Sequence, residues 1–241
     1  MCTAIVHVPA EPARPVRLLA VRDEDPQRAW QPLGAWWPAT HPGVVGVRDA
    51  LAGGAWIAAD DETRRAAVLL NRRPVEQPDG REPRSRGHLV LDAVEGRSVA
   101  EPPPTNGFNL VAIGVDGARV TMWDGVSVRR VVLSPGIHMI AHDDVDDAAT
   151  ARIATWRDAF GEPGDGPDWW MPWLDTVERT NRFGPLDDRA IVRDNRPHGY
   201  PTLSLLVCAV SVSAEGVDAL YGEFDRPGVW NRPDLRPPVV P

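Results

Sequence analysis

Short apolar runs separated by turn residues fill the first part of the chain. Each run has the length of a strand, and the residues between runs are rich in Pro, Gly and Asp. The pattern predicts strands over residues 2–8, 16–21, 44–47, 55–59 and 66–70. Because the Pro-rich segment 9–15 separates the first two runs, we expect them to form a hairpin with Cys2 at its open end.

A second group of apolar runs covers residues 109–141. Asp116-Gly117, Asp124-Gly125 and Pro135-Gly136 divide it, and Asp-Gly between apolar runs is a strong hairpin signal. We therefore expect an antiparallel meander of four strands, over residues 109–115, 119–123, 126–133 and 137–141.

Helical spacing of apolar residues is found in three places. Ser85 can cap a helix over residues 86–95, which follows a polar, Pro-rich loop that begins at Pro74. A second helix is expected over 146–160, where Asp146 and Asp147 would suit the positive end of the helix dipole. A third is expected over 169–180. Strands over 203–212 and 217–224 and a Pro-rich tail over 227–241 complete the chain.

Strands at both ends, helices between them and no clear linker predict one α+β domain over residues 1–241. We find no internal repeat. The chain has 241 residues, with 43% hydrophobic and 25% charged, which is enough to bury a substantial core.

The charge composition excludes several kinds of function. The net charge of −8 argues against a general nucleic-acid binder. All 26 basic residues counted as Lys or Arg are Arg, so no lysine can form a Schiff base or serve a P-loop. We see no signal peptide and no apolar stretch of membrane-spanning length, and we expect a soluble cytoplasmic protein. Two cysteines, Cys2 and Cys208, make no disulfide framework.

Cys2 is the residue with the most distinctive chemistry. If Met1 is removed, one residue carries both a thiol nucleophile and an α-amine that can act as its base. The alternative is that Cys2 is a small buried hydrophobic residue, as free cysteines often are.

Three further motifs can join Cys2 in a site. Arg22-Asp23-Glu24 ends the strand that would pair with the Cys2 strand, where Arg would favour a thiolate and Asp would hold the amine. Gly53-Gly54-Ala55-Trp56 is a tight turn into a strand, and Asn71 can donate to an oxyanion. Each also has a structural interpretation: a solvated charge cluster, a simple turn and a strand-end cap.

The order of these motifs resembles the NRDE family, which is the family of transport and Golgi organisation protein 2. The resemblance runs from Met1 to about Gly136 and includes Pro83-Arg84-Ser85-Arg86-Gly87 and Gly107-Phe108-Asn109-Leu110. In the motif that names the family, the leading Asn is replaced by Val21. Later in the chain the resemblance is weak.

The resemblance implies a four-layer αββα sandwich like that of N-terminal nucleophile hydrolases. It further implies that Cys2 is the catalytic nucleophile, that Arg22 and Asp23 assist it and that Asn71 holds the oxyanion. We expect the substrate to contact residues of the other motifs, namely Gly53, Gly54, Trp56 and Asn109.

His138 and His142 lie four residues apart, a spacing that on a helix could place both imidazoles on one metal ion. In a strand that spacing separates them by roughly 13 Å, too far for one metal ion. We therefore expect no metal site, and we expect no cofactor.

Two functions remain open at this point. The first is hydrolysis of a non-peptide amide bond of a small molecule by Cys2. The second is binding or trafficking of a hydrophobic small molecule such as haem without chemistry, since members of the family have been linked to haem trafficking and the chain holds ten Trp. A weaker third interpretation is a scaffold without activity, with the tail 227–241 as a partner arm or a disordered end. The oligomeric state and the substrate are not predicted.

Overall fold

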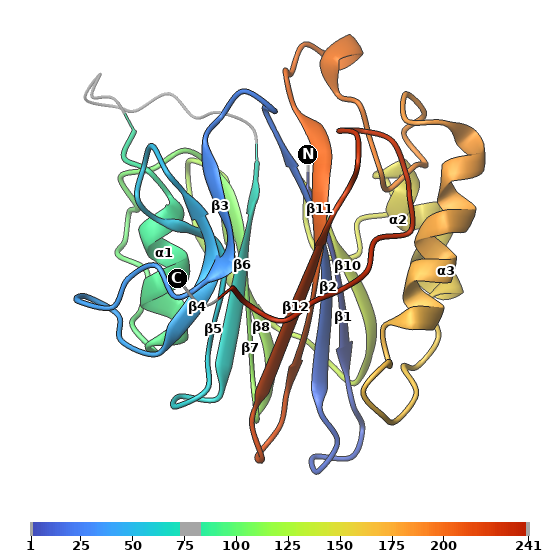
Figure 1. The fold of residues 1–241 in the computed structure, drawn as a ribbon. Coiled ribbons are helices and arrows are strands. Elements are labelled where there is room, and N and C mark those ends of the chain that lie inside the picture. The colour runs from blue at the N-terminus through green and yellow to red at the C-terminus, as the bar shows by residue number, and fades with distance from the viewer. Residues whose placement is uncertain (1, 73–82, 240–241) are drawn as a thin grey trace.

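Two antiparallel sheets face each other in the computed structural model, which describes residues 2–72 and 83–239 (Figure 1). The five-stranded sheet has the order β10 (Gly136–Ile140), β1 (Thr3–Val8), β2 (Val16–Glu24), β11 (Leu203–Val212), β12 (Val217–Glu223). The seven-stranded sheet has the order β3 (Trp30–Gly34), β4 (Val44–Asp49), β5 (Ala55–Asp60), β6 (Arg65–Asn71), β7 (Phe108–Gly114), β8 (Gly117–Trp123), β9 (Val128–Val132). The predicted α+β class is confirmed.

Helices cover the outer face of each sheet (Figure 1). Helix α1 (Gly87–Val94) packs on β5 and β6, whereas α2 (Ala151–Trp156) and α3 (Met171–Thr180) lie outside the five-stranded sheet. Short 3-10 turns follow at η1 (Arg157–Ala159), η2 (Asn181–Phe183) and η3 (Arg196–His198). No helix among the described residues is long and apolar enough to cross a membrane.

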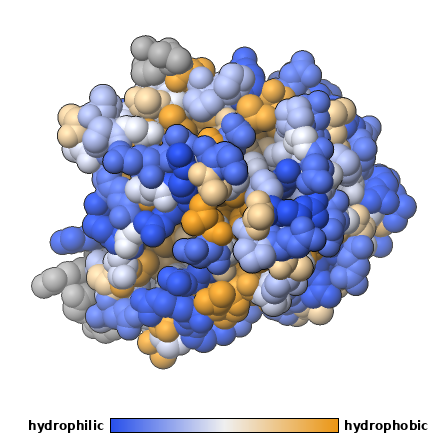
Figure 2. All heavy atoms as spheres, turned by 90° about the horizontal axis from the view of Figure 1, so that it is seen from below, coloured by the Kyte–Doolittle hydropathy of each residue, from blue (hydrophilic) through white to orange (hydrophobic). Residues whose placement is uncertain are grey.

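Three apolar cores hold these layers together. The largest lies between the sheets, a second lies between the five-stranded sheet and α2 and α3, and a third lies under α1. Seen from below, apolar atoms form a broken band through the middle of the molecule with hydrophilic atoms on both sides (Figure 2). Both sheets are therefore apolar on two faces, which explains why their strands are apolar runs rather than alternating ones.

The predicted hairpin of the first two strands is confirmed. β1 and β2 are antiparallel, and Thr3 lies opposite Val21. Side chains of a strand alternate between its two faces. Ala4 and Leu18 accordingly lie in the core between the sheets, whereas Ile5 lies in the core under the helices.

The predicted four-stranded meander is wrong in its last strand. β7, β8 and β9 are consecutive neighbours, but β10 leaves them and pairs with β1 in the other sheet. The physical reason is burial, because β9 is largely exposed, whereas Met139 and Ile140 of β10 are fully buried beside β1.

The helix predicted over 146–160 is shorter than expected at its start. Asp146 has a φ of 56°, which is outside the helical region, and its carboxylate accepts a 2.8 Å hydrogen bond from the Met139 N–H. Asp146 therefore braces the end of β10, Asp147 accepts a hydrogen bond from the Ala149 N–H, and the helix begins only at Ala151.

Two segments near the sheet edges differ from the sequence prediction. Strand β3 was not predicted, because Gln31 and Pro32 interrupt its apolar pattern. The Pro-rich tail, described as far as residue 239, packs on the fold, and the Val239 N–H donates to the Leu33 carbonyl at 2.7 Å. The interpretation of the tail as a disordered end is thus wrong for these residues, and its role as a partner arm stays a prediction. Most of the loop predicted from Pro74 lies outside the described residues.

A close backbone contact between two glycines allows α1 to pack against the seven-stranded sheet. A Cβ atom on Gly54 would lie 2.5 Å from the carbonyl carbon of Gly87, so neither position has room for a side chain. Gly87 is the first residue of α1, its N–H donates to the Ser85 hydroxyl at 3.3 Å, and the cap position is Arg86 rather than Ser85. The predicted turn at Gly53-Gly54 therefore also brings the backbone of Gly54 close to this helix.

We expect Gly54→Ala to lower the free energy of unfolding by about 2–3 kcal/mol, because the added methyl group meets backbone that cannot rotate away. Urea denaturation followed by Trp fluorescence measures the change. Gly161→Ala is the control, because its added methyl group has open space around it and should change stability by less than about 0.5 kcal/mol. Equal stability of the two variants would contradict the tight contact.

Candidate active site

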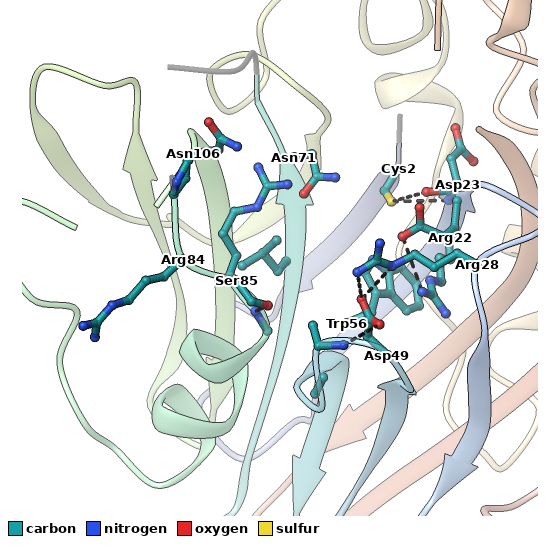
Figure 3. A pocket seen from close by; sticks show the side chains of 17 residues that line it. Cys2, Arg22, Asp23, Arg28, Asp49, Trp56, Asn71, Arg84, Ser85 and Asn106 are labelled. Carbon is teal, nitrogen blue, oxygen red and sulfur yellow. Dashed lines mark hydrogen bonds and ion pairs between the residues drawn. The ribbon is translucent and has the colours of Figure 1, made fainter. Parts of the chain in front are cut away.

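A cavity of about 300 Å³ opens at the end of the sandwich where the chain starts (Figure 3). Both sheets and the start of α1 contribute to it. A smaller cavity of about 140 Å³ adjoins it. Five residues line both cavities and therefore mark their junction: Cys2, Asp23, Asn71, Arg86 and Asn106.

The Cys2 thiol is held against the backbone of the neighbouring strand. Its Sγ accepts a hydrogen bond from the Asp23 N–H at 3.3 Å and lies 3.6 Å from the Asp23 carbonyl oxygen. Cys2 is only 6% exposed. Burial, followed by the charge of the Asp23 carboxylate, raises the pKa of the thiol above its ordinary value, so the resting group is a neutral thiol that needs a base.

The side chain of Arg22 points from β2 toward the core between the two sheets. Its guanidinium stacks over the Trp30 and Trp56 rings at 5.6 and 5.9 Å, and its Nη2 lies 3.5 Å from a Glu24 carboxylate oxygen. The buried Nε and Nη1 of Arg22 have no hydrogen-bond acceptor among the described residues. That Arg22 stabilises a Cys2 thiolate stays a prediction.

The Asp23 side chain points to the opposite side of β2, toward the helices. Ser204 Oγ donates to its Oδ1 at 2.5 Å, and Asn195 Nδ2 donates to its Oδ2 at 3.0 Å. Burial alone would raise the pKa of this carboxyl. Nearby positive charge and hydrogen bonds, including those from Ser204 and Asn195, outweigh burial and bring the pKa below the ordinary value. Asp23 is therefore a fixed carboxylate.

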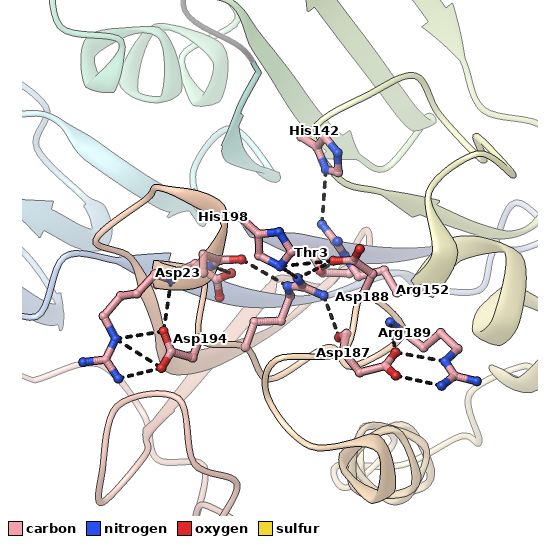
Figure 4. A network of polar contacts seen from close by, with 12 residues as sticks. Thr3, Asp23, His142, Arg152, Asp187, Asp188, Arg189, Asp194 and His198 are labelled. Carbon is pink, nitrogen blue, oxygen red and sulfur yellow. Dashed lines mark hydrogen bonds and ion pairs between the residues drawn. The ribbon is translucent and has the colours of Figure 1, made fainter.

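A polar network behind Asp23 holds these partners in place (Figure 4). The Arg193 N–H donates to Ser204 Oγ at 2.8 Å, and Arg193 Nε donates to Asn195 Oδ1 at 3.1 Å. Next to it, Arg152 Nε donates to Thr3 Oγ1 at 2.9 Å. Burial, with the charge of nearby Arg193, lowers the pKa of Arg152 to about 10, so it remains a cation at neutral pH.

The opposite wall of the site comes from the seven-stranded sheet. Trp56 and Asn71 line the large cavity, and Asn71 stands at the exposed end of β6 (Figure 3). The predicted contact residues Gly53 and Gly54 do not line it. Gly53 has a φ of 75° in the turn before β5, where its N–H donates to the Asp49 carbonyl at 2.8 Å.

Asn109 also lies away from both cavities. Its amide donates to the carbonyls of Ala141 and Asp143 at 2.9 and 2.7 Å, and its Oδ1 accepts from Arg72 at 3.0 Å. These contacts tie β7 to the end of β10 and thus join the two sheets. Asn109 is placed as a structural residue, and its predicted role in substrate binding is not supported by this geometry.

The structure adds residues to the site that the sequence patterns do not single out, among them Asn106, which lines both cavities. Arg86 was noted only as part of a motif, yet it lines both cavities beside Cys2. Ser204 and Asn195 hold Asp23, but they lie some 170 to 180 residues away in the chain. The pairing of β11 with β2 places Ser204 opposite Asp23, whereas Asn195 reaches Asp23 from the segment before β11.

His138 and His142 have partners other than a metal ion. His138 Nδ1 lies 2.7 Å from the Asp146 carboxylate, and this hydrogen bond raises the pKa of His138. His142 lies 3.5 Å from Arg152, and burial, then the Arg152 charge, lowers its pKa to about 4. Within residues 2–72 and 83–239, no group of three or more His, Cys, Asp or Glu side chains is placed to hold a metal ion.

The sequence profile of the family described as Transport and Golgi organisation 2 matches residues 1–162, which is 162 of the 241 residues. The chain belongs to this family. The match confirms the resemblance found in the sequence motifs and covers Cys2, Arg22, Asp23, Asn71 and Arg86. Ser204 and Asn195 lie beyond it. No curated protein matches the chain.

We expect Asn109→Ala and Asn71→Ala to differ in their effect on stability. Asn109→Ala leaves two carbonyls and an Arg72 N–H without their partner and should lower the free energy of unfolding by about 2–4 kcal/mol. Asn71→Ala changes an exposed side chain and should cost less than about 0.5 kcal/mol. Urea denaturation measures both. A large loss in the Asn71 variant would mean that this side chain serves the fold rather than the cavity.

Proposed function

We propose that this member of the family is an N-terminal cysteine hydrolase that cleaves a non-peptide amide bond of a small molecule. The observation that carries the proposal is the position of the Cys2 thiol at the junction of two cavities. The thiol accepts a hydrogen bond from the Asp23 N–H, and hydrogen bonds fix the Asp23 carboxylate nearby. The order helix, sheet, sheet, helix supports the finer proposal of an αββα sandwich like that of N-terminal nucleophile hydrolases. We also propose a cytoplasmic location.

The proposed reaction begins after removal of Met1. The α-amine of Cys2 takes the thiol proton, and the sulfur attacks the amide carbonyl to form a C–S bond. The amine then returns the proton to the leaving nitrogen as the C–N bond breaks. Water hydrolyses the resulting thioester, which releases the acid and restores the thiol. The raised pKa of Cys2 is the reason why a base at the same residue is needed.

The other side chains are assigned by their positions. The side-chain amide of Asn71 faces the same cavity and would donate to the oxyanion. Asp23 would orient the α-amine, since Ser204 and Asn195 fix its carboxylate within range of the Cys2 thiol. The Asp23 N–H already donates to sulfur and would stabilise a thiolate there.

The second candidate function is binding of a hydrophobic molecule such as haem, and it requires a side chain in the same cavities that can ligate the iron. Among the described residues that line them, Cys2 and Tyr200 are of the types that commonly ligate haem iron, and none is a histidine. We expect added haem to give no specific Soret shift. A shift that is lost in Cys2→Ala would favour the binding function.

We expect Cys2→Ala to lower amide hydrolysis to the background rate, roughly 10³-fold or more, because it removes the nucleophile. A panel of N-acyl amides, with the released amine detected by fluorescence labelling, measures the rate. Cys208→Ala is the matched control, since that thiol is buried in the core between the sheets and should be dispensable.

The mass of the intact protein tests the condition for this mechanism. We expect a mass without Met1. A protein that retains Met1, or a Cys2→Ala variant with undiminished hydrolysis, would contradict the proposed function.

A further inference from the structure

The charges around the large cavity are paired unevenly. Arg28 donates to one Asp49 oxygen through Nε and Nη2 at 2.8 and 2.6 Å, so these two charges compensate each other. Arg22 forms an ion pair with Glu24, whose carboxylate oxygen lies 3.5 Å from Nη2 of the guanidinium. The remaining acid of the lining, Asp23, directs its carboxylate to the far side of β2, where Ser204 and Asn195 hold it.

Two arginines of the lining, Arg84 and Arg86, are left over by this pairing, and of these two Arg86 also lines the smaller cavity. Its Nη1 donates to the Gly107 carbonyl at 2.8 Å, and no carboxylate among the described residues lies within ion-pair distance of it. Burial lowers the pKa of Arg86, and the charges of Glu24 and of a Cys2 thiolate act in the opposite direction. Arg86 is thus an anchored, half-buried cation within electrostatic range of the sulfur.

The second basic residue of this loop has a different position. Arg84 is exposed, and its side chain points away from Cys2 (Figure 3). Of the two arginines of this loop, Arg86 is therefore the one that lies at the junction of the cavities.

Other donors in the cavity wall add to this positive environment. Nε and Nη1 of Arg22 and Nε1 of Trp56 are buried and have no acceptor among the described residues. Buried N–H groups without acceptors are costly, and a nearby negative charge lowers that cost because electrostatic interactions are stronger away from water. The wall of the cavity therefore favours an anion.

We propose that the substrate carries a carboxylate close to the scissile amide and that Arg86 binds it. This inference rests on the proposed function and names the substrate class of the same site. A guanidinium presents parallel N–H groups that match the two oxygens of a carboxylate, and its Nε and Nη2 are not used by the bond to Gly107. A cavity of about 300 Å³ lies at the small end of the range for ligand pockets, so the substrate is an N-acyl amino acid or a similarly small amide acid.

A protection experiment tests carboxylate binding without requiring turnover. Iodoacetamide alkylates Cys2 when its sulfur displaces iodide, and peptide mass spectrometry separates this from any reaction at the buried Cys208. We expect N-acetylglycine to slow alkylation of the wild-type protein at concentrations about tenfold lower than its neutral counterpart, N-acetylglycinamide. Inorganic phosphate is the third probe and should protect weakly.

Variants at two neighbouring arginines identify the residue responsible. Arg86→Gln should remove the advantage of N-acetylglycine over N-acetylglycinamide, and Arg86→Lys should keep part of it because the charge remains. Arg84→Gln is the matched control: it makes the same charge change two residues away and should retain the full advantage. Circular dichroism of each variant shows that the fold is kept.

Three outcomes would overturn the inference. Equal protection of the wild-type protein by the acid and the amide would show that no carboxylate is recognised. Protection by phosphate as strong as by N-acetylglycine would show a general anion site, and equal losses in the Arg84 and Arg86 variants would show an effect of net charge. Because alkylation needs neither Met1 removal nor hydrolysis, carboxylate recognition can succeed or fail independently of the proposed reaction.

Discussion

The antiparallel pairing of β1 with β2 is the constraint on which the site depends. It places Cys2 across from the last residues of β2, where the Asp23 N–H donates to the thiol at 3.3 Å. A shift of one residue would turn every side chain of β1 to the other face and remove the thiol from the cavity. Both strands are buried on two sides, so the register is strongly specified.

Side chains alternate along β2, so that neighbouring residues of the motif point to opposite faces of the strand. Arg22 enters the space between the sheets and stacks on two indole rings, whereas Asp23 enters the polar network under the helices. Adjacent residues of one motif therefore meet different surroundings. Within the described part of the chain, the cavity wall keeps donors without acceptors and an Arg86 without a carboxylate partner, while the far side fixes a carboxylate with hydrogen bonds.

Much of the local structure was predictable because it depends on neighbours in the chain. The hairpin at the start, β11, and the strands that end in Asp-Gly turns follow from apolar runs and turn residues. The motifs also brought Cys2, Arg22, Asp23, Trp56 and Asn71 together as one group, and the structure lines one cavity with them. Their chemical roles remain predictions.

The sequence by itself determined the family, the α+β class and the residues most suited to chemistry, because these depend on local order and on residue type. Only the tertiary structure decided that β10 joins the sheet of Cys2, that Gly54 seats a helix and that Asn109 joins two sheets. It also brought Ser204, Asn195 and Arg86 to the site. The physical reason is that contacts between residues far apart in the chain are selected by burial and strand pairing of the whole fold, and no local pattern records them.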